Sequence, residues 1–236
     1  MNKLKFMRRI HNDIFELFFP RYCAGCQNQL HHFENALCLH CIMMLPRASI
    51  HQLRENKLER LFWGRADVSM ATAFLRMSRK GLTHRLVHEL KYEGNKEIGQ
   101  LLGTLFGQEL KKIDEWKSVD LIIPVPLHPK KEQLRGYNQS YEIASGVSES
   151  MDVPTTKTAL TRKHYTDTQT KKSRVERWQN VSEIFDINEN ELNTSNHILL
   201  VDDVITTGAT IESCVLALTN NKKIRVSVAA LAMPVR

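Results

Sequence analysis

The fold of this chain is determined by residues 197–210, His197-Ile-Leu-Leu-Val-Asp202-Asp203-Val-Ile-Thr206-Thr207-Gly208-Ala209-Thr210. Its apolar first half predicts a buried strand, and two carboxylates follow at the carboxyl end of that strand. A small, hydroxyl-rich loop comes next and opens a predicted helix, whose free N–H groups and positive dipole end suit a phosphate. Ligands of open α/β sheets bind at strand carboxyl ends, so this stretch predicts an anion-binding site.

Strands and helices alternate along the rest of the chain. Apolar runs predict strands over residues 67–77, 119–125, 156–162, 197–203 and 224–233. Helical periodicity predicts helices over residues 50–60, 81–92, 95–113, 137–150 and 210–219. The alternation predicts an α/β fold with a mostly parallel sheet and helices on both faces.

Two Cys-x-x-Cys pairs lie close together near the N-terminus, Cys23-Ala-Gly-Cys26 and Cys38-Leu-His-Cys41. Two such pairs suit one tetrahedral, structural Zn²⁺ per chain. The nearby His31, His32 and His40 are interpreted as surface residues, because four thiolates already complete a site. Clustered cysteines without a disulfide framework are typical of a reducing compartment, which predicts a cytoplasmic protein.

A domain boundary is expected near residue 60. Residues 1–60 would hold an N-terminal helix and the four-cysteine module, and residues 61–236 the α/β domain. The amphipathic pattern of residues 1–19 predicts a helix that packs on the body of the protein, with peripheral membrane contact as the alternative. No stretch approaches the roughly 20 apolar residues that span a bilayer.

The chain is basic, with a net charge of +7 and an isoelectric point of about 9.2. This charge favours an anionic partner such as nucleic acid, a phosphorylated metabolite or anionic lipid. Residues 162–180 are basic and polar and have no apolar periodicity. They predict a mobile flap that closes over an anionic substrate, with a solvated basic loop as the alternative.

The aspartate and threonine motif resembles the signature of the type I phosphoribosyltransferases, in which four apolar residues precede two acidic residues and a threonine–glycine loop. The resemblance implies a site for phosphoribosyl diphosphate (PRPP) with Mg²⁺. Asp202 and Asp203 would hold the ribose hydroxyls, and residues 206–210 would hold the 5-phosphate. The alternative, a strand ending in solvated aspartates before a capped helix, leaves the loop composition unexplained.

From Leu17 onward the chain is similar to the ComF family, competence-associated proteins that join a zinc module to a phosphoribosyltransferase-like domain. The matching pieces follow in the same order. They are Phe19-Pro20 with the cysteine pairs, Leu90-Lys91-Tyr92-x-Gly94-Asn95, Ile123-Pro124-Val125-Pro126-Leu127, Arg135-Gly136-Tyr137-Asn138-Gln139, residues 162–185 and the aspartate–threonine motif.

The resemblance implies further site residues. Pro124, Val125, Pro126 and Leu127 would form the diphosphate-binding turn, where proline can fix a backbone that points N–H groups at the leaving group. Lys91 and Arg135 would supply positive charge to the departing diphosphate, and together with Asp202 and Asp203 they are the expected catalytic residues. The expected flap residues are Arg162, Thr166, Gln169, Arg177 and Asn180.

Two functions fit the resemblance. One is a phosphoribosyltransferase with an unidentified, nitrogenous acceptor that acts in DNA uptake and natural transformation. The other is a non-catalytic, PRPP-responsive competence protein that binds single-stranded DNA or other DNA-uptake proteins. Thr206 argues against a 6-oxopurine acceptor, because salvage enzymes with this motif carry an aspartate there as base. Candidates for stacking on a base are Trp63, Tyr137, Tyr165 and Trp178, although aromatic residues more often belong to the core.

Overall fold

The computed structural model describes residues 20–163, 184–192, 194–219 and 224–235. The chain divides into two compact units, Met1–Leu45 and Pro46–Arg236, called unit 1 and unit 2 below. The helix predicted over residues 1–19 lies outside the described residues. Among the described residues, no helix combines the length and the apolar character needed to cross a membrane.

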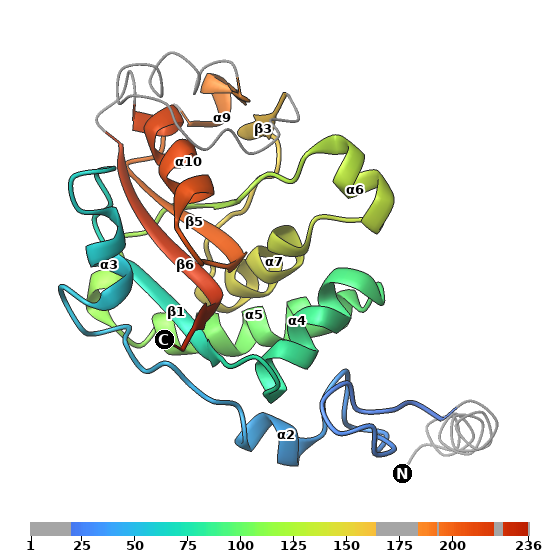
Figure 1. Cartoon of the computed structure of the whole chain (residues 1–236). Coiled ribbons are helices and arrows are strands. Elements are labelled where there is room, and N and C mark those ends of the chain that lie inside the picture. The colour runs from blue at the N-terminus through green and yellow to red at the C-terminus, as the bar shows by residue number, and fades with distance from the viewer. Residues whose placement is uncertain (1–19, 164–183, 193, 220–223, 236) are drawn as a thin grey trace, which may run out of the picture. The chain divides into compact units, whose positions relative to one another are not determined.

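Unit 2 is built on a four-stranded parallel sheet in the order β1-β6-β5-β2 (Figure 1). The strands are β1 (Ala71–Met77), β2 (Leu121–Pro124), β5 (His197–Val204) and β6 (Arg225–Pro234). The two central strands, β5 and β6, are buried on both faces for most of their length. This explains why they read as near-continuous apolar runs, and it confirms the predicted α/β architecture.

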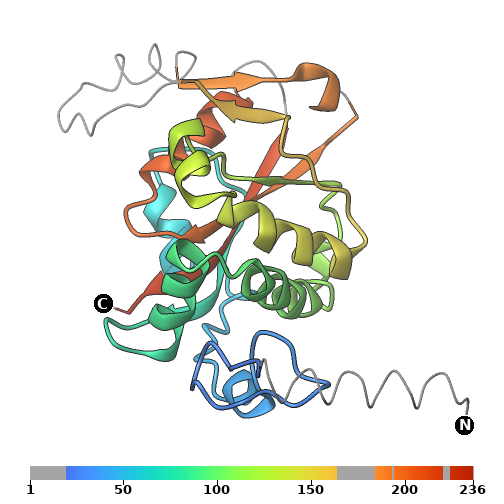
Figure 2. The ribbon, with the colours of Figure 1, turned by 90° about the vertical axis from the view of Figure 1, so that its right-hand side faces the viewer.

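One face of the sheet is covered by α4 (Leu82–Tyr92), α5 (Lys96–Leu110) and α7 (Gln139–Met151). Figures 1 and 2 both show α5 and α7 side by side. Glycines allow this close approach, because a Cβ at Gly103 would lie 2.2 Å from the Ile143 carbonyl oxygen and a Cβ at Gly146 2.2 Å from that of Gln100. The packing fixes α7 beside β5, with its N-terminal end at the carboxyl end of that strand.

The other face is covered by α3 (Lys57–Phe62) and α10 (Ala209–Thr219). Leu58 and Phe62 of α3 and Ile211 and Val215 of α10 belong to one buried apolar cluster with the strands. The cap of α3 is Asn56, whose side chain accepts hydrogen bonds from the N–H groups of residues 58 and 59. The helix therefore begins at residue 57, within the region expected to be helical.

Only the end of the strand expected over residues 156–162 forms, and it lies outside the four-stranded sheet. This end is β3 (Leu160–Arg162), which pairs antiparallel with β4 (Phe185–Ile187) in a separate two-stranded sheet. Among the described residues of unit 2, three further short helices had no apolar periodicity to predict them. They are η1 (Asp114–Trp116), α6 (Pro129–Arg135) and α9 (Glu189–Leu192).

Residues 46–60 were expected with the cysteine module, but they pack within unit 2. The Ala48 N–H donates to the Phe74 carbonyl and the Arg76 N–H to the Pro46 carbonyl, so this segment lies along the free edge of β1. Unit 1 contains the cysteine pairs and one described helix, α2 (Leu39–Met43).

Candidate functional site

Asp202 and Asp203 lie where β5 reaches its carboxyl end. The first five residues of the strand are buried and the last three are half-buried, so both carboxyl groups stand at the boundary between core and solvent. Oδ1 of Asp202 accepts hydrogen bonds from Oγ of Ser140 at 3.0 Å and from the Asp203 N–H at 2.8 Å. Burial, followed by the adjacent Asp203 charge, raises the pKa of Asp202 to about 7. The carboxyl group of Asp202 therefore keeps its proton to a higher pH than an ordinary aspartate does.

Lys91 is brought to this pair by α4. Its Nζ lies 2.9 Å from Oδ2 of Asp203, and both side chains are largely buried. The end of α4 is held in place because the Tyr137 hydroxyl donates to the carbonyl of Leu90, which would otherwise lack a helical partner. Of the two cations expected to act on a diphosphate, Lys91 thus lies at the carboxylates themselves.

The threonine loop joins β5 to α10 with an unusual backbone at Gly208. This residue has φ +74°, and a Cβ there would lie 2.9 Å from side-chain atoms of Leu61 and Phe62. Glycine is required for both reasons, since a side chain would be strained and would collide with α3. Four residues of the loop are exposed: Thr206, Thr207, Ala209 and Thr210. The Ala209 N–H donates to the Thr207 hydroxyl at 3.5 Å. The loop has the composition and helix-start position of a phosphate site.

Arg65, which lies outside the motif, is hydrogen-bonded to the same loop. Its guanidinium donates to the Thr207 carbonyl at 2.9 Å and to the Glu212 carboxylate at 3.0 Å. Glu212 lies in the first turn of α10, so Arg65 offsets a negative charge close to the expected phosphate. No sequence pattern pointed to Arg65, because its partners are far away in the chain.

The expected diphosphate turn offers fewer N–H groups than its position suggested. Pro124 and Pro126 have none, and the Val125 N–H donates to the Val201 carbonyl at 2.8 Å as part of the sheet. Leu127 is therefore the one residue of this described turn whose N–H is not used in a hydrogen bond of the structure. The peptide bonds of the turn are trans. The side chain of Asn138, the cap of α7, donates to the Val125 carbonyl at 3.0 Å and so ties the turn to that helix.

Arg135 ends α6, a helix without buried residues that lies at the edge of unit 2 (Figure 1). Its Nη1 donates to Oε1 of Gln139 at 2.8 Å, and its Cζ lies 5.7 Å from the centroid of the Tyr92 ring. Gln139 directly precedes Ser140, which places Arg135 near the carboxylates but pairs it with neutral groups. Of the expected flap residues, Arg162 ends β3, and Thr166, Gln169, Arg177 and Asn180 lie outside the described residues.

The aromatic residues considered for stacking differ in their exposure. Tyr137, considered for stacking on a base, is 6% exposed, and burial raises its pKa to about 12. It is buried and instead holds the end of α4 in place through the hydrogen bond from its hydroxyl to the Leu90 carbonyl. Trp63 is 58% exposed at the end of α3, and Tyr92, which was not considered, is 64% exposed at the end of α4. Tyr165 and Trp178 lie outside the described residues.

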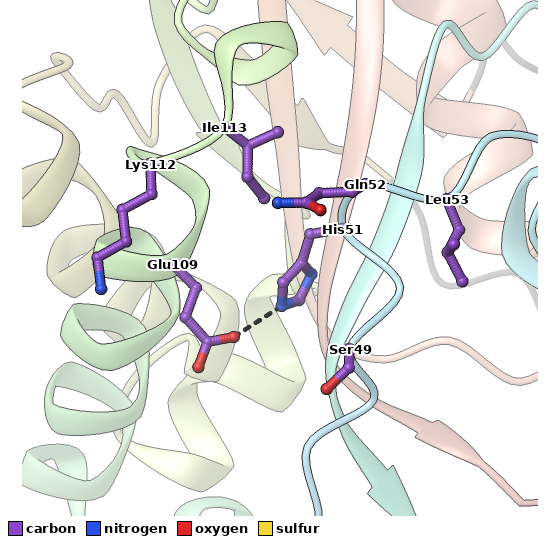
Figure 3. A pocket seen from close by; sticks show the side chains of 7 residues that line it. All are labelled: Ser49, His51, Gln52, Leu53, Glu109, Lys112 and Ile113. Atoms are coloured by element: carbon purple, nitrogen blue, oxygen red, sulfur yellow. Dashed lines mark hydrogen bonds and ion pairs between the residues drawn. The ribbon is translucent and has the colours of Figure 1, made fainter.

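A cavity of ≈ 340 Å³ in unit 2 contains none of these residues (Figure 3). His51 stands in its wall, with Nδ1 2.6 Å from the Thr72 hydroxyl and Nε2 2.8 Å from the Glu109 carboxylate. Burial lowers the pKa of His51, and a neutral ring that accepts from Thr72 and donates to Glu109 satisfies all three groups. These bonds attach the segment after residue 48 to β1 and α5, which gives the cluster a structural role.

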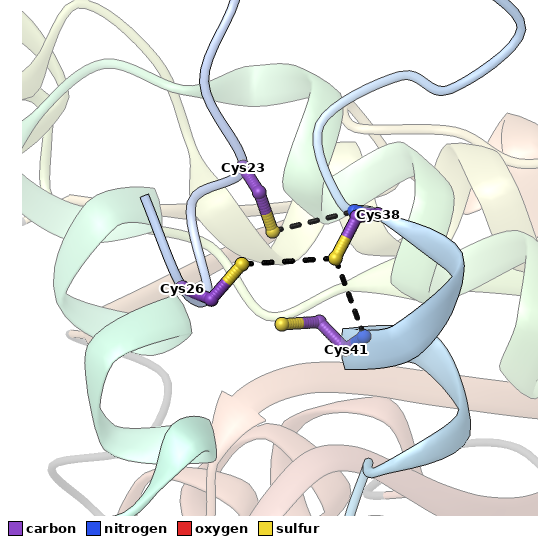
Figure 4. Close-up of side chains that lie close together, drawn as sticks. All are labelled: Cys23, Cys26, Cys38 and Cys41. Atoms are coloured by element: carbon purple, nitrogen blue, oxygen red, sulfur yellow. Dashed lines mark hydrogen bonds between the residues drawn. The ribbon is translucent and has the colours of Figure 1, made fainter. Parts of the chain in front are cut away.

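The four cysteines of unit 1 converge as their spacing predicted (Figure 4). Their Sγ atoms all lie within 4.8 Å of one another, and those of Cys26 and Cys38 are 3.7 Å apart. Tetrahedral Zn²⁺ with Zn–S bonds of about 2.3 Å requires a sulfur separation of about 3.8 Å. Backbone N–H groups also donate to sulfur, from Gly25 and Cys38 to Cys23 and from Cys41 to Cys38. The arrangement fits a tetrahedral metal ion.

The ionisation of the thiols supports the same conclusion. Burial and the neighbouring sulfurs raise the pKa of Cys41. Burial acts in the same direction on Cys23, but N–H donors outweigh it and lower the pKa of that thiol to about 7. Four thiolates this close together repel one another, so a divalent cation is what would allow all four to ionise.

Comparison with known proteins bears on both units. Residues 137–234 match the phosphoribosyl transferase domain family. Competence protein F of Haemophilus influenzae is 29% identical over 191 residues, which are 80% of each chain. Competence protein ComFC of Bacillus subtilis is 33% identical over 122 residues, 51% of this chain and 47% of that protein. DNA utilization protein YhgH of Escherichia coli K12 is 31% identical over 140 residues, 58% of this chain and 60% of that protein.

This chain belongs to the ComF family. As a ComF protein it carries a type I phosphoribosyltransferase domain, and the match begins at Tyr137 and ends in β6, so it spans α7, the aspartates and the threonine loop. Among solved structures, the glutamine PRPP amidotransferase of Bacillus subtilis aligns over 61% of this chain and 30% of its own. The two are 18% identical, with a TM-score of 0.39.

Proposed function

We propose that this ComF protein binds PRPP together with Mg²⁺ at the carboxyl end of β5, and that it acts in the cytoplasm during DNA uptake. The observation that carries the proposal is the adjacency of two half-buried carboxylates and an anion-receptive loop, joined through residues 202–210. Asp202 and Asp203 would accept hydrogen bonds from the ribose hydroxyls, and the N–H and hydroxyl groups of the loop would hold the 5-phosphate.

Mg²⁺ is expected with this ligand. The ion usually takes one or two protein carboxylates and completes its shell with water and substrate phosphates, and Asp202 and Asp203 provide such carboxylates at an accessible strand end. Bound Mg²⁺ would neutralise charge on the diphosphate. Lys91 would act from the protein side, because its ammonium already lies at the carboxylate pair.

We further propose that the protein transfers the phosphoribosyl group. A nitrogen of the acceptor would form a bond to C1 of the ribose as the bond from C1 to the diphosphate oxygen breaks. Diphosphate would leave with the bonding electrons, and the proton of the acceptor nitrogen would pass to solvent. Lys91 and Arg135 would stabilise the leaving charge, and Leu127 would offer its N–H. Thr206 supplies no carboxylate base, so the acceptor must lose its proton without one from this loop.

A second candidate is a competence protein that responds to PRPP without transferring it and binds single-stranded DNA. The absence of a carboxylate at Thr206 and the basic charge of the chain favour it. The names of the relatives, which refer to competence and DNA utilization, support a role in DNA uptake under either candidate. The cysteine module would give the chain a structural Zn²⁺ in both.

Calorimetry with PRPP, with and without Mg²⁺, tests the binding site. The native chain should bind and the double variant Asp202→Asn, Asp203→Asn should not, whereas equal weak binding by both would reject the site. Release of diphosphate in the presence of candidate bases then separates transfer from binding alone. Binding of a single-stranded oligonucleotide across a range of salt concentrations tests the DNA role, because each phosphate contact steepens the salt dependence.

A further inference from the structure

Tyr92 presents an aromatic ring to solvent and directly follows Lys91, the lysine that pairs with Asp203. It is the last residue of α4 and is 64% exposed. The His88 ring, one helical turn earlier, lies 4.9 Å from it at an interplanar angle of 48°. The Arg135 guanidinium carbon lies over the ring, 5.7 Å from its centroid. The ring is therefore oriented by two nitrogen-bearing side chains and still keeps most of its surface accessible.

Short connections relate this ring to both carboxylates. The residue before Tyr92 is Lys91, whose ammonium binds Asp203. Arg135 donates to Gln139, which is followed by Ser140, whose hydroxyl binds Asp202. The ring thus belongs to the side of the site where the cations expected to act on the diphosphate gather.

Trp63 is a comparably exposed ring, but it belongs to the other side. It is 58% exposed and follows Leu61 and Phe62, which contact the Cβ position of Gly208. It therefore lies beside the threonine loop, where the 5-phosphate is expected. On PRPP the 5-phosphate and the diphosphate-bearing C1 are attached at different ends of the sugar. A base bonded to C1 would accordingly stand nearer to Tyr92 than to Trp63.

We propose that Tyr92, with Arg135 and His88, forms a stacking subsite for a planar nitrogen heterocycle of nucleobase size. The proposal rests on the function proposed above and names the class of acceptor that the site would take. An exposed tyrosine offers a π-face that any base can stack on, and a guanidinium beside it adds a second planar, cationic surface. Such a pair selects for flat aromatic ligands and leaves their hydrogen-bonding edges to other residues.

The test compares five ligands that share ribose and a 5-phosphate and differ in whether they carry a base and in which base it is. Ribose 5-phosphate and the four nucleoside 5-monophosphates, AMP, GMP, CMP and UMP, are titrated into the full chain by calorimetry. At least one monophosphate should bind about tenfold more tightly than ribose 5-phosphate, as expected for one stacked base. Tyr92→Ala should remove this preference and leave the affinity for ribose 5-phosphate within about twofold, whereas Tyr92→Trp should preserve it.

Trp63→Ala is the matched control, since it removes an exposed ring of similar accessibility. It should leave the preference for the monophosphate intact. Equal binding of ribose 5-phosphate and all four monophosphates to the native chain would overturn the subsite. The subsite would also be overturned if Trp63→Ala lost the preference for a monophosphate over ribose 5-phosphate, or if Tyr92→Ala kept it. Failure of the proposed function looks different, because then neither PRPP nor ribose 5-phosphate binds the native chain at all.

Discussion

The Nζ atom of Lys91 lies 2.9 Å from Oδ2 of Asp203, so one lysine offsets one of two adjacent carboxylates at the end of β5. The same positive charge acts against the rise in the pKa of Asp202 that burial and Asp203 produce. Lys91 therefore helps to set the pH at which Asp202 loses its proton and the two carboxylates can bind a ligand.

Replacement of Lys91 by Met should raise the pH at which PRPP binds. Without the ammonium, ionisation of Asp202 becomes less favourable, so the midpoint of affinity against pH moves upward. At neutral pH the affinity should fall about tenfold, the typical effect of one charge-assisted hydrogen bond. Calorimetry over a pH series measures both effects. Lys111→Met, which breaks a surface pair with Asp152, should change neither. An unchanged pH profile in Lys91→Met would contradict this role.

Asp202 should make the stability of the protein depend on pH in a specific direction. Its pKa is raised from 3.8 to about 7, so between these values the native state holds a proton that the unfolded state has lost. The free energy of unfolding therefore falls as pH rises through this window. Because asparagine cannot ionise, the free energy of unfolding of the Asp202→Asn variant does not fall in this way as the pH rises. Relative to the native chain, this variant should gain roughly 2 to 4 kcal/mol between about pH 4 and about pH 8. Urea unfolding measures the difference, and a pH-independent gap would refute the raised pKa.

Gly208→Ala should destabilise unit 2 more than a glycine substitution that meets only backbone strain. Gly94 provides the comparison, because its φ is +71° and a Cβ there would meet nothing within 4 Å. Gly94→Ala should cost about 1 kcal/mol for its left-handed backbone. Gly208→Ala should cost roughly 2 to 4 kcal/mol, since the added methyl also collides with Leu61 and Phe62. Equal losses in urea unfolding would show that the contact with α3 is unimportant.

The cysteine module should contain about one zinc ion per chain, measurable by mass spectrometry of the purified protein. Removal by a strong chelator should unfold residues 20–45, because so small a segment cannot be stabilised by apolar burial alone. Cys38→Ser should lose the metal. Cys214→Ala is the control, since Cys214 is buried in α10 and lies outside the cluster. A chain free of metal whose cysteine module stays folded would contradict the assignment.

The sequence predicted the central elements well because their burial leaves a simple pattern. Strands β5 and β6 are covered on both faces and read as apolar runs, and α4, α5 and α7 each bury one stripe. Helix α6 buries no residue, so no periodicity marks it, and its ends are set by Pro129 and the left-handed Gly136. Strands β3 and β4 are three residues long and depend on pairing between distant segments, which no local pattern reveals.

In the candidate site too, some residues could be recognised from the sequence and others only from the folded chain. The carboxylates and the loop are consecutive in the chain and could be recognised together. Ser140 and Arg65 act through partners more than sixty residues away, at Asp202 and Glu212, and could be found only when the chain was folded. Tyr137 shows the converse. It was a candidate for stacking on a base, yet it is buried in the folded chain and its hydroxyl donates to the Leu90 carbonyl.

Binding of PRPP by residues 202–210 can be observed in a crystal structure of the full chain with PRPP and Mg²⁺. The 5-phosphate should lie within about 3 Å of backbone nitrogens of residues 208–210, with the ribose hydroxyls on Asp202 and Asp203. A complex in which PRPP lies elsewhere, while Asp202 keeps Ser140 and Asp203 keeps Lys91 and neither touches the ligand, would contradict it.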